Sequence, residues 1–220
     1  RLSGGTCTVQ TSPTGQHLND VDVIDATHAW AVGSSGEIVR TVNGTDWTTV
    51  SSPTGAYLTA VQFVSATEGW IAGLSNTLYY TPDAGATWLP KNTAEAAMQI
   101  NDFRVDGDTV WVVGRTTSWD LRVYKATDGR IHSTAPADVP SYALVPVAGM
   151  SGAPMHIGYT DATHLWLVTT EGEVLFHDGT TWSEQTTQYP SRWLYGIDFR
   201  NATTGVLVGD GGAIARSATG

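Results

Sequence analysis

The chain has 220 residues, of which 41% are hydrophobic, and its 21 acidic against 11 basic residues give a net charge of −10. This charge excludes nucleic acids and anionic membrane surfaces as partners, because both attract proteins of the opposite sign, and no apolar run is long enough to cross a bilayer. One cysteine, Cys7, permits neither an internal disulfide nor a cysteine-based zinc site. Nine tryptophans and 24 glycines, with many Thr and Val residues, favour short strands joined by tight turns.

An internal repeat of about 40 residues organises the chain. The segment from Leu18 to Gly33 recurs with a tryptophan in register, and the later copies start at Leu58, Ile100, Met155 and Leu194. The register position is occupied by Trp30, Trp70, Trp111, Trp166 and Val206. Five copies at this spacing predict a five-bladed β-propeller, with an insertion between Ser133 and Pro154 that stretches one interval.

Each copy is expected to form four strands. The first strand alternates, as at Val21 and Val23, and the second is almost continuously apolar, as at 29–32, which indicates burial on both faces. A glycine-bearing turn leads to a third strand, and a polar turn leads to a fourth strand that opens on an aromatic residue. The predicted repeats of this single domain, 1–220, lie near 18–50, 58–91, 100–135, 155–185 and 194–220, the last together with 1–12.

The two ends of the chain are expected to belong to the same blade. The segment from Cys7 to Leu18 matches the segment from Trp47 to Leu58 without a gap, so it begins with a fourth strand that lacks the first three. A strand donated to the last blade would remove that blade's open edge. The sequence therefore predicts an all-β, five-bladed propeller with four-stranded blades, closed by the N-terminal strand. An open fragment of a larger ring is the alternative.

The polar turn before each fourth strand follows the pattern Ser/Thr-x-Asp-x-Gly-x-Thr-Trp. Residues 81–88 match it at every defined position, and shortened or altered versions occur at 41–47, 126–129 and 177–182. In such a turn a short polar side chain accepts backbone N–H groups, glycine supplies a positive φ, and the aromatic ring packs between strands. A structural role is therefore expected for Thr41, Asn43, Gly44, Trp47, Thr81, Asp83, Gly85, Trp88, Asp128, Gly129, Asp178, Gly179 and Trp182.

These turns, together with the Gly-Trp-x-x-Gly segment at 69–73, resemble the Asp-box (BNR-like) repeat proteins. Within that group the repeats are most similar to those of the photosystem II assembly and stability factors, and sialidases are more distant relatives. The resemblance covers nearly the whole chain. It implies that the Asp-box turns lie on the face opposite the functional one, and it makes a protein-assembly or scaffold role a candidate function.

The functional face is expected where first strands begin and where second and third strands are joined. Residues at these positions differ between copies and supply aromatic, amide and imidazole groups, which is the composition of a glycan or peptide platform. The turn at 115–122 is longer than its equivalents and carries another tryptophan. The expected ligand-binding residues are His17, Asn19, Tyr57, Thr59, Asn101, Trp119, Trp193 and Tyr195. The alternative is that the aromatic residues plug the funnel or cover a neighbouring blade.

Enzymatic chemistry has one candidate pair of residues. Asp20 and Asp102 occupy equivalent first-strand positions and could face each other across a narrow ring, as the two carboxylates of a carbohydrate hydrolase do. Either aspartate could instead bond a local turn. The arginine triad of a sialidase cannot be placed. His28 and His164 share one turn position and the histidines show no paired spacing, so neither a metal nor a cofactor is expected.

The sequence thus predicts a non-catalytic recognition propeller that binds a glycan or an extended peptide on its top face, around the central funnel. A carbohydrate-active hydrolase using Asp20 and Asp102 and a protein-assembly or scaffold factor are the alternatives. The expected partner is a glycan, a protein or a peptide, with no nucleic acid and no membrane insertion. One cysteine and few lysines are compatible with an exported bacterial protein, extracellular or periplasmic.

Overall fold

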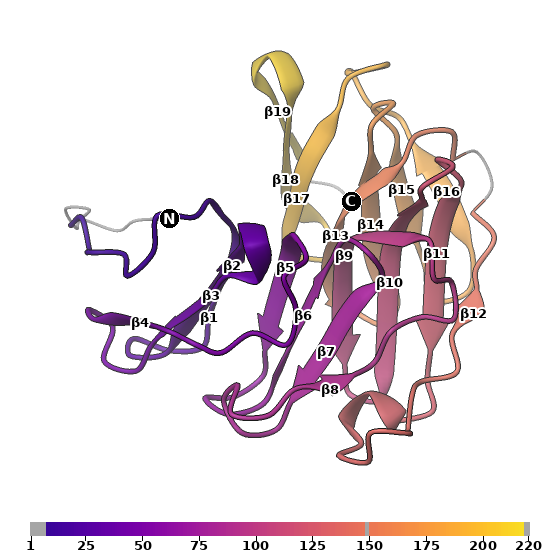
Figure 1. The fold of residues 1–220 in the computed structure, drawn as a ribbon. Helices are drawn as coiled ribbons and strands as arrows, with labels where there is room; N and C mark the ends of the chain where they lie inside the picture. The colour runs from indigo at the N-terminus through magenta and orange to yellow at the C-terminus, as the bar shows by residue number, and fades with distance from the viewer. Residues whose placement is uncertain (1–7, 148–149, 218–220) are drawn as a thin grey trace.

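The computed structural model describes residues 8–147 and 150–217, which form antiparallel sheets arranged around a common centre (Figure 1). Five sheets follow one another along these residues, and each is built from consecutive strands, which confirms the predicted all-β, five-bladed propeller. The helical segments among these residues are the short 3₁₀ turns Ser34–Gly36, Arg130–His132 and Asp210–Gly212. No helix in the described ranges has the length and apolar character needed to cross a membrane.

The sheets are named blades 1 to 5 in chain order, and the first four have four strands each. Blades 1 and 2 consist of β1 (Leu18–Val23), β2 (Ala29–Gly33), β3 (Ile38–Thr41), β4 (Trp47–Thr49), β5 (Leu58–Phe63), β6 (Gly69–Gly73), β7 (Thr77–Thr81) and β8 (Leu89–Pro90). Blades 3 and 4 consist of β9 (Met98–Asp106), β10 (Thr109–Thr116), β11 (Leu121–Ala126), β12 (Ala143–Leu144), β13 (Pro154–Asp161), β14 (His164–Thr169), β15 (Val174–His177) and β16 (Trp182–Gln185). Blade 5 has three strands within the described residues: β17 (Leu194–Asn201), β18 (Thr204–Gly209) and β19 (Ala213–Ser217).

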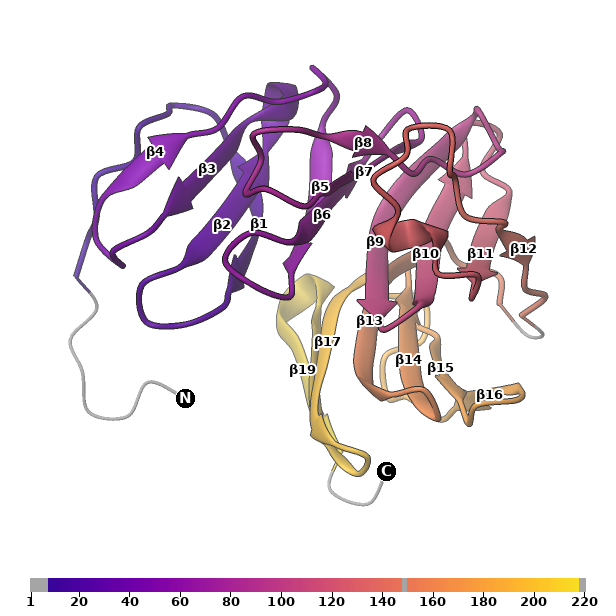
Figure 2. The same ribbon diagram turned by 90° about the horizontal axis from the view of Figure 1, so that it is seen from below.

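The hydrophobic core is divided among the contacts between successive blades. The central residues of the second strands in blades 1 to 4 are apolar because the two faces of each strand pack against different neighbours, and β2 and β6 are buried at every residue. Its tryptophan packs on the first strand of the next blade: Trp30 stacks on Phe63 with ring centroids 3.9 Å apart, and Trp166 stacks on Phe199 at 3.6 Å. The core clusters thus hold each blade against the next one. In this arrangement the first strands lie nearest the propeller axis (Figure 2).

Residues 133–147, the described first part of the insertion between Ser133 and Pro154, lie along the outer edge of blade 3. Its residues Ala143–Leu144 form β12, which pairs with β11, so the fourth strand of this blade lies beyond the repeat expected near 100–135. Lys91 is completely buried beneath the insertion and donates a hydrogen bond from Nζ to the Asp138 carbonyl oxygen at 2.5 Å. The Tyr142 hydroxyl donates to the Lys91 carbonyl oxygen at 2.7 Å. Residues 138–144 of the insertion are therefore an ordered part of the flank.

The predicted closing strand falls partly on residues 1–7, which lie outside the described residues. Residues 8–12 form no strand, but the turn after them repeats its expected counterpart bond by bond. Ser12 Oγ donates to the Thr14 carbonyl oxygen as Ser52 Oγ does to that of Thr54. The match between the two segments is thus reproduced in local geometry at the turn, residues 12–16 and 52–56.

Candidate functional site

The connections between strands lie on two opposite faces of the propeller, because successive strands run in opposite directions. The N–H of Ser34, in the turn between β2 and β3, donates to the His17 carbonyl oxygen just before β1, so these two connections share one face, called here the top face. The Gly44 N–H of the Asp-box turn donates to the Thr27 carbonyl oxygen in the turn after β1, on the opposite, bottom face. The expected arrangement of top and bottom turns is therefore the one observed.

A glycine at the end of the second strand lets the segment before the first strand approach that strand closely on the top face. A side-chain carbon placed on Gly33 would overlap the His17 carbonyl group, and one placed on Gly73 would overlap the carbonyl oxygen of Tyr57. Because these glycines lack a side chain, the segment that leads into each first strand passes directly over its own second strand. The side chains that follow are thereby brought to the rim of the central funnel.

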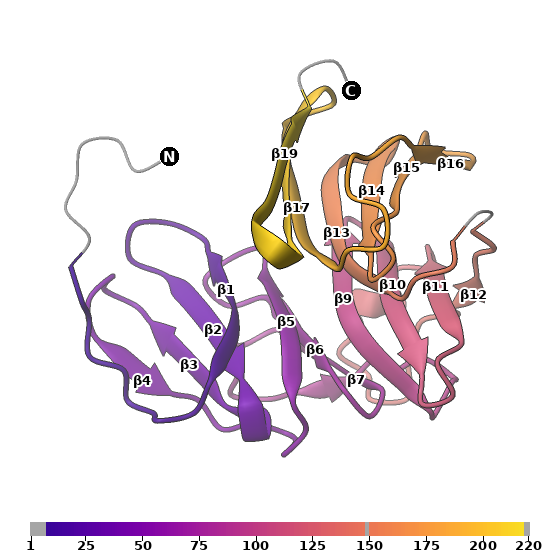
Figure 3. The same ribbon diagram turned by 90° about the horizontal axis from the view of Figure 1, so that it is seen from above.

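A central pocket of about 240 Å³ opens among the first strands of all five blades. Figure 3 shows how the strands of the five blades are arranged around the centre. Five of the predicted ligand-binding residues line it, together with both predicted carboxylates and two residues of blade 4. Its lining consists of Asn19, Asp20, Tyr57, Thr59, Asn101, Asp102, Met155, His156 and Tyr195. His17, Trp119 and Trp193 do not line this pocket. Met155 and His156 are not among the eight expected ligand-binding residues, although the repeat places the blade 4 segment near 154–156 at this face.

Several pocket residues also tie one blade to the next. Asn19 Nδ2 donates to the Leu58 carbonyl oxygen at 2.7 Å, and Asn101 Nδ2 donates to that of Pro154 at 2.8 Å. Thr59 Oγ1 donates to the Ile100 carbonyl oxygen at 2.9 Å. These three side chains occupy the same register position in successive blades, so their amide and hydroxyl groups hold the rim of the funnel in place.

Asp20 and Asp102 enter the same pocket, as their repeat positions predict. Asp20 accepts hydrogen bonds from the N–H groups of its neighbour Val21 and of Val61 in blade 2, both at 2.8 Å. Asp102 is 9% exposed and accepts from Phe103 at 2.8 Å and from Ile157 in blade 4 at 2.7 Å.

Burial is the main cause that raises the pKa of both carboxyl groups, and the charge of Asp102 raises that of Asp20 further. His156 opposes this shift at Asp102, with Nε2 lying 3.7 Å from Oδ2. The pocket is therefore a partly desolvated acidic site whose carboxylates are fixed in position by neighbouring strands.

Aromatic side chains surround the pocket and remain accessible. Tyr57, Trp193 and Tyr195 are 44%, 47% and 48% exposed, so they form a rim and do not fill the funnel as packing residues would. The Tyr57 hydroxyl donates to Asn19 Oδ1 at 2.8 Å, and the rings of Trp193 and Tyr195 meet edge to face with centroids 6.3 Å apart. The aromatic rim is thus preorganised by a hydrogen bond from Tyr57 to Asn19 and by the ring contact between Trp193 and Tyr195.

The long turn of blade 3 presents a separate aromatic group on the top face. Trp119 is 60% exposed and has a positive φ of 67°, a conformation that is uncommon for a bulky residue. The guanidinium of Arg115 lies 3.6 Å from the centroid of its ring. Thr117 N–H donates to the Ala97 carbonyl oxygen, which fixes the turn beside the start of β9. Trp119 therefore faces solvent and does not cover a neighbouring blade.

The Asp-box turns lie on the bottom face. The polar side chains of three of them bond within their own turn, and Asp128 also bonds the insertion. Asp83 accepts the Thr87 N–H at 2.8 Å and the Thr87 hydroxyl at 2.7 Å. Asn43 accepts the N–H groups of Thr45 and Asp46 at 2.9 and 2.8 Å. The equivalent bonds of Asp178 come from Thr180 and Thr181, and those of Asp128 come from Arg130 and Ser141. These geometries agree with the structural role expected for the box residues.

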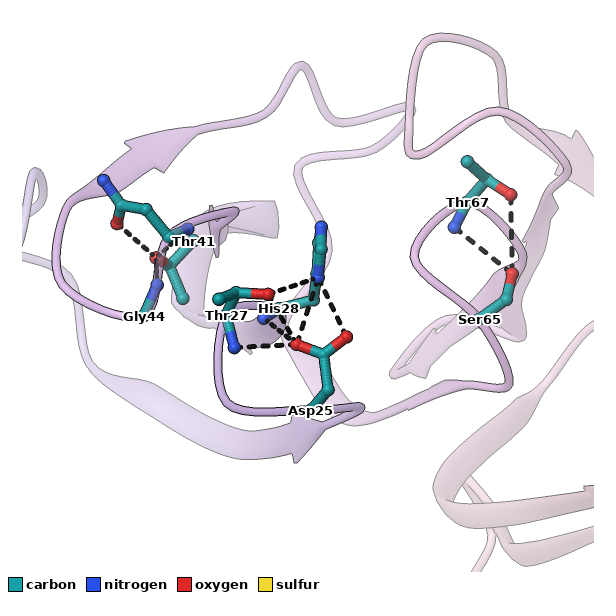
Figure 4. Close-up of polar contacts among 8 residues, drawn as sticks. Asp25, Thr27, His28, Thr41, Gly44, Ser65 and Thr67 are labelled. Atoms are coloured by element: carbon teal, nitrogen blue, oxygen red, sulfur yellow. Dashed lines mark hydrogen bonds and ion pairs between the residues drawn. The ribbon is translucent and has the colours of Figure 1, made fainter.

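In the neighbouring turn after β1, an aspartate side chain likewise accepts backbone N–H groups of its own turn (Figure 4). Asp25 Oδ1 accepts the N–H groups of Thr27 and His28 at 2.7 and 2.8 Å, and His28 Nδ1 lies 3.0 Å from Asp25 Oδ2. His164 makes the equivalent contact with Asp161 at 2.9 Å. The two histidines belong to local turns, and the described residues contain no group of three or more His, Cys, Asp or Glu placed to hold a metal ion.

Comparisons with known proteins place these features in a family context. A family model described as "Photosynthesis system II assembly factor YCF48" matches residues 43–119, from the Asp-box turn of blade 1 to the long turn of blade 3. No curated protein matches the chain.

Solved structures share the fold at low sequence identity. The chain is 18% identical to a structure described as "YCF48 bound to D1 peptide", with a TM-score of 0.53, 96% of this chain covered and 80% of that one. For YCF48 from Cyanidioschyzon merolae the identity is 15% and the TM-score 0.58, with 96% and 84% covered. For a catalytically inactive virginiamycin B lyase from Staphylococcus aureus, solved with quinupristin, the identity is 12% and the TM-score 0.71, with 94% and 72% covered.

The family match and these structures agree with the Asp-box turns and the five sheets described above. The chain is a BNR-like five-bladed β-propeller, and its residues 43–119 match the photosystem II assembly factor YCF48 family.

Proposed function

We propose that this propeller is a non-catalytic recognition module that binds an extended peptide segment of a partner protein on its top face. The observation that carries the proposal is the central pocket, to which all five blades contribute and which has an accessible aromatic rim. A narrow pocket with exposed rings and fixed amide groups suits one anchoring side chain and the peptide backbone on either side of it. The similar YCF48 structure with a D1 peptide supports a peptide in preference to a glycan.

The charge of the pocket favours a cationic anchoring residue. Asp20 and Asp102 converge on it, and the chain as a whole carries a charge of −10. A Lys or Arg side chain entering the pocket would lie beside two carboxyl groups, offset one negative charge and lie against the rings of Tyr57 and Tyr195. We therefore propose peptides with an exposed basic residue as the preferred class, and a protein-assembly role as the wider context.

The experiment is a selection from a displayed random-peptide library on the purified chain, followed by titration calorimetry with the enriched peptides. The double variant Y57A/W193A should weaken binding at least tenfold, because exposed aromatic residues at a recognition surface carry a large share of the binding energy. Val42→Ala, which alters an exposed apolar residue in the Asp-box turn of the bottom face, is the matched control and should bind normally. Failure to enrich any peptide, or equal binding by the top-face variant, would contradict the proposal.

The hydrolase alternative rests on the same two aspartates, so it is tested separately. Each carboxylate already accepts two backbone N–H groups, one of them from the next blade, which favours a tie between blades over proton transfer. If the wild-type chain releases sugar from a panel of polysaccharides and Asp20→Asn abolishes that release, the hydrolase replaces the recognition module. Unchanged release in Asp20→Asn would remove the candidate.

A further inference from the structure

The Asp-box turn of blade 4 differs from those of blades 1 and 2 at its first position. In blade 2 this position is Thr81, whose hydroxyl oxygen accepts the Gly85 N–H of its own turn at 2.8 Å, and Thr41 makes the corresponding bond in blade 1. In blade 4 the position is His177, and its Nδ1 accepts the Gly179 N–H at 3.0 Å. A histidine nitrogen thus replaces a threonine oxygen as the acceptor of the turn.

The two kinds of acceptor respond differently to protons. A hydroxyl oxygen keeps its lone pairs across the neutral and mildly acidic pH range, whereas an imidazole nitrogen accepts a hydrogen bond only while it carries no proton. Because a backbone N–H can only donate, Nδ1 of His177 is the unprotonated nitrogen, and the neutral ring carries its proton on Nε2. A proton added to Nδ1 would point one donor at another and break the bond to Gly179.

His177 lies between two tryptophan rings at the contact between blades 3 and 4. It is 4% exposed, and the centroid of its ring is 5.1 Å from that of Trp111 on β10 and 4.8 Å from that of Trp182 on β16. The two indole rings meet edge to face with centroids 6.0 Å apart. A positive charge on His177 would therefore be separated from water by the packing of two blades.

Among the described residues, two charged groups act on His177, and the stronger of them opposes its protonation. Lys125 Nζ lies 4.7 Å from the centroid of the Trp111 ring, so this ring already faces a cation. Burial and then Lys125 lower the pKa of His177 below its ordinary value of 6.5, while Asp178 of the same turn acts to raise it. The neutral ring therefore contributes stability that is fully present above pH 6.5 and is lost as the pH falls towards the lowered folded-state pKa.

The tryptophan of this turn depends on ring contacts for its place against blade 3. In blade 2, Trp88 donates its Nε1–H to the carbonyl oxygen of Ser51, which follows β4 of blade 1, at 3.1 Å. Trp182 Nε1 is buried and has no hydrogen-bond partner within the described parts of the chain. The edge of blade 4 is thus held here through the packing of His177 and Trp182 on Trp111.

We propose that His177 is an acid-sensitive switch, which holds the Asp-box turn of blade 4 closed against blade 3 at neutral pH and releases it on protonation. The proton enters at Nδ1, which then loses the Gly179 N–H, and the imidazolium moves away from Lys125 towards solvent. Trp182 moves with the turn, so its contact with Trp111 opens. The change is confined to the bottom face, and the central pocket on the top face keeps its lining.

Amide hydrogen exchange at single residues, measured by NMR, tests the switch with the turn of blade 2 as an internal reference. Between about pH 6.5 and pH 4.5 the protection of the Gly179 N–H should fall about tenfold relative to that of the Gly85 N–H, whose acceptor is the Thr81 hydroxyl. Imidazole nitrogen shifts should show Nδ1 of His177 gaining its proton over the same range. Protection of Gly179 that stays constant relative to Gly85 would overturn the inference.

Two substitutions at His177 remove the titration while keeping an acceptor. His177→Thr restores the hydroxyl found in blades 1 and 2, and His177→Asn places an amide oxygen near the position of Nδ1. In each folded variant the protection of Gly179 relative to Gly85 should no longer depend on pH. His164→Asn changes the histidine that bonds Asp161 in another turn of the same blade, and it is the matched control that should keep the wild-type response. A response that persists in either His177 variant contradicts the proposal.

The charge of Lys125 provides the second arm of the test. Lys125→Met keeps most of the apolar stem but removes a charge that lowers the pKa of His177, so the midpoint of the Gly179 transition should move to higher pH. A midpoint that stays in place or moves to lower pH would show that the transition does not come from His177 beside Lys125, and would overturn the inference.

Discussion

At the scale of single residues, the Asp-box positions act through bonds inside one turn. Asp83 accepts both the N–H and the hydroxyl of Thr87, and these bonds hold its pKa below the ordinary value. Asp83→Ala removes both acceptors from an exposed turn, so the free energy of unfolding should fall by about 1 kcal/mol. Urea denaturation followed by tryptophan fluorescence measures this. Glu184→Ala, an exposed substitution on β16, is the control, and an equal effect in both variants would refute the assignment.

Asp102 differs from the box residues because it joins two blades in a buried position. Asp102→Ala leaves the Ile157 N–H without its acceptor, so the free energy of unfolding should fall by about 1–3 kcal/mol. If urea titration places Asp102→Ala within error of the wild type, then the bond between blades 3 and 4 contributes nothing measurable.

The pH dependence of the same residue gives a separate prediction. Burial raises its folded-state pKa above 3.8, so its contribution to stability is fully present below that pH and is lost as pH rises through the raised pKa. Asp102→Asn removes this titration. The unfolding free energy of the variant should therefore decrease less than that of the wild type between about pH 4 and pH 7. Parallel slopes in urea titrations across that range would contradict the prediction.

At the scale of elements, Lys91 fixes the insertion to the flank of blade 3. Its side chain is completely buried, burial lowers its pKa, and its ammonium group bonds the Asp138 carbonyl oxygen. Lys91→Met keeps most of the apolar stem but removes the donor, so amide hydrogen exchange at 133–142 should become faster while that of β9 and β10 is unchanged. Lys125→Met, which removes the other lysine, is the matched control. Unchanged protection of the insertion in Lys91→Met would show that Lys91 does not hold it.

A second polar attachment holds the segment before β13. Glu173 accepts hydrogen bonds from the Ser151 N–H, the Ser151 hydroxyl, the Gly152 N–H and the Thr169 hydroxyl at 2.6 to 3.0 Å. Burial acts to raise its pKa, but these donors outweigh burial and hold it below the ordinary value. The carboxylate therefore fixes the chain where blade 4 approaches the central pocket.

At the scale of the whole molecule, carboxyl groups with lowered pKa values make the fold sensitive to acid. They are Asp25, Asp83, Glu95, Asp128, Asp161, Glu173 and Asp178. Each contributes stability that is present above its unfolded-state pKa, 3.8 for Asp and 4.5 for Glu, and lost as pH falls through its folded-state value, which for Asp161 is about 2. Thermal melts should show a falling Tm from about pH 4.5 downwards. A Tm that stays constant to about pH 2.5 would contradict this account.

The sequence alone was sufficient to predict the blades, because each copy of its repeat forms one blade. Apolar second strands such as 29–32 and 110–113 can be buried only between two other sheets, and polar turns such as 81–88 close on themselves, so both features are local or periodic. The same register correctly placed Asp20 and Asp102 in one pocket and five of the expected binding residues around it. Whether those residues bind a ligand stays a prediction.

Only the tertiary structure decided what depends on contacts between distant segments. The path of the insertion, which supplies β12 and covers Lys91, has no counterpart in the other repeats and no periodic signal of its own. The bonds from Asp20 and Asp102 to the next blade, and the exposure of Tyr57, Trp193 and Tyr195, follow from how neighbouring sheets meet around the axis. A repeat specifies each blade through short-range spacing, but the pocket and its rim are set by the packing of whole sheets, which spacing along the chain does not encode.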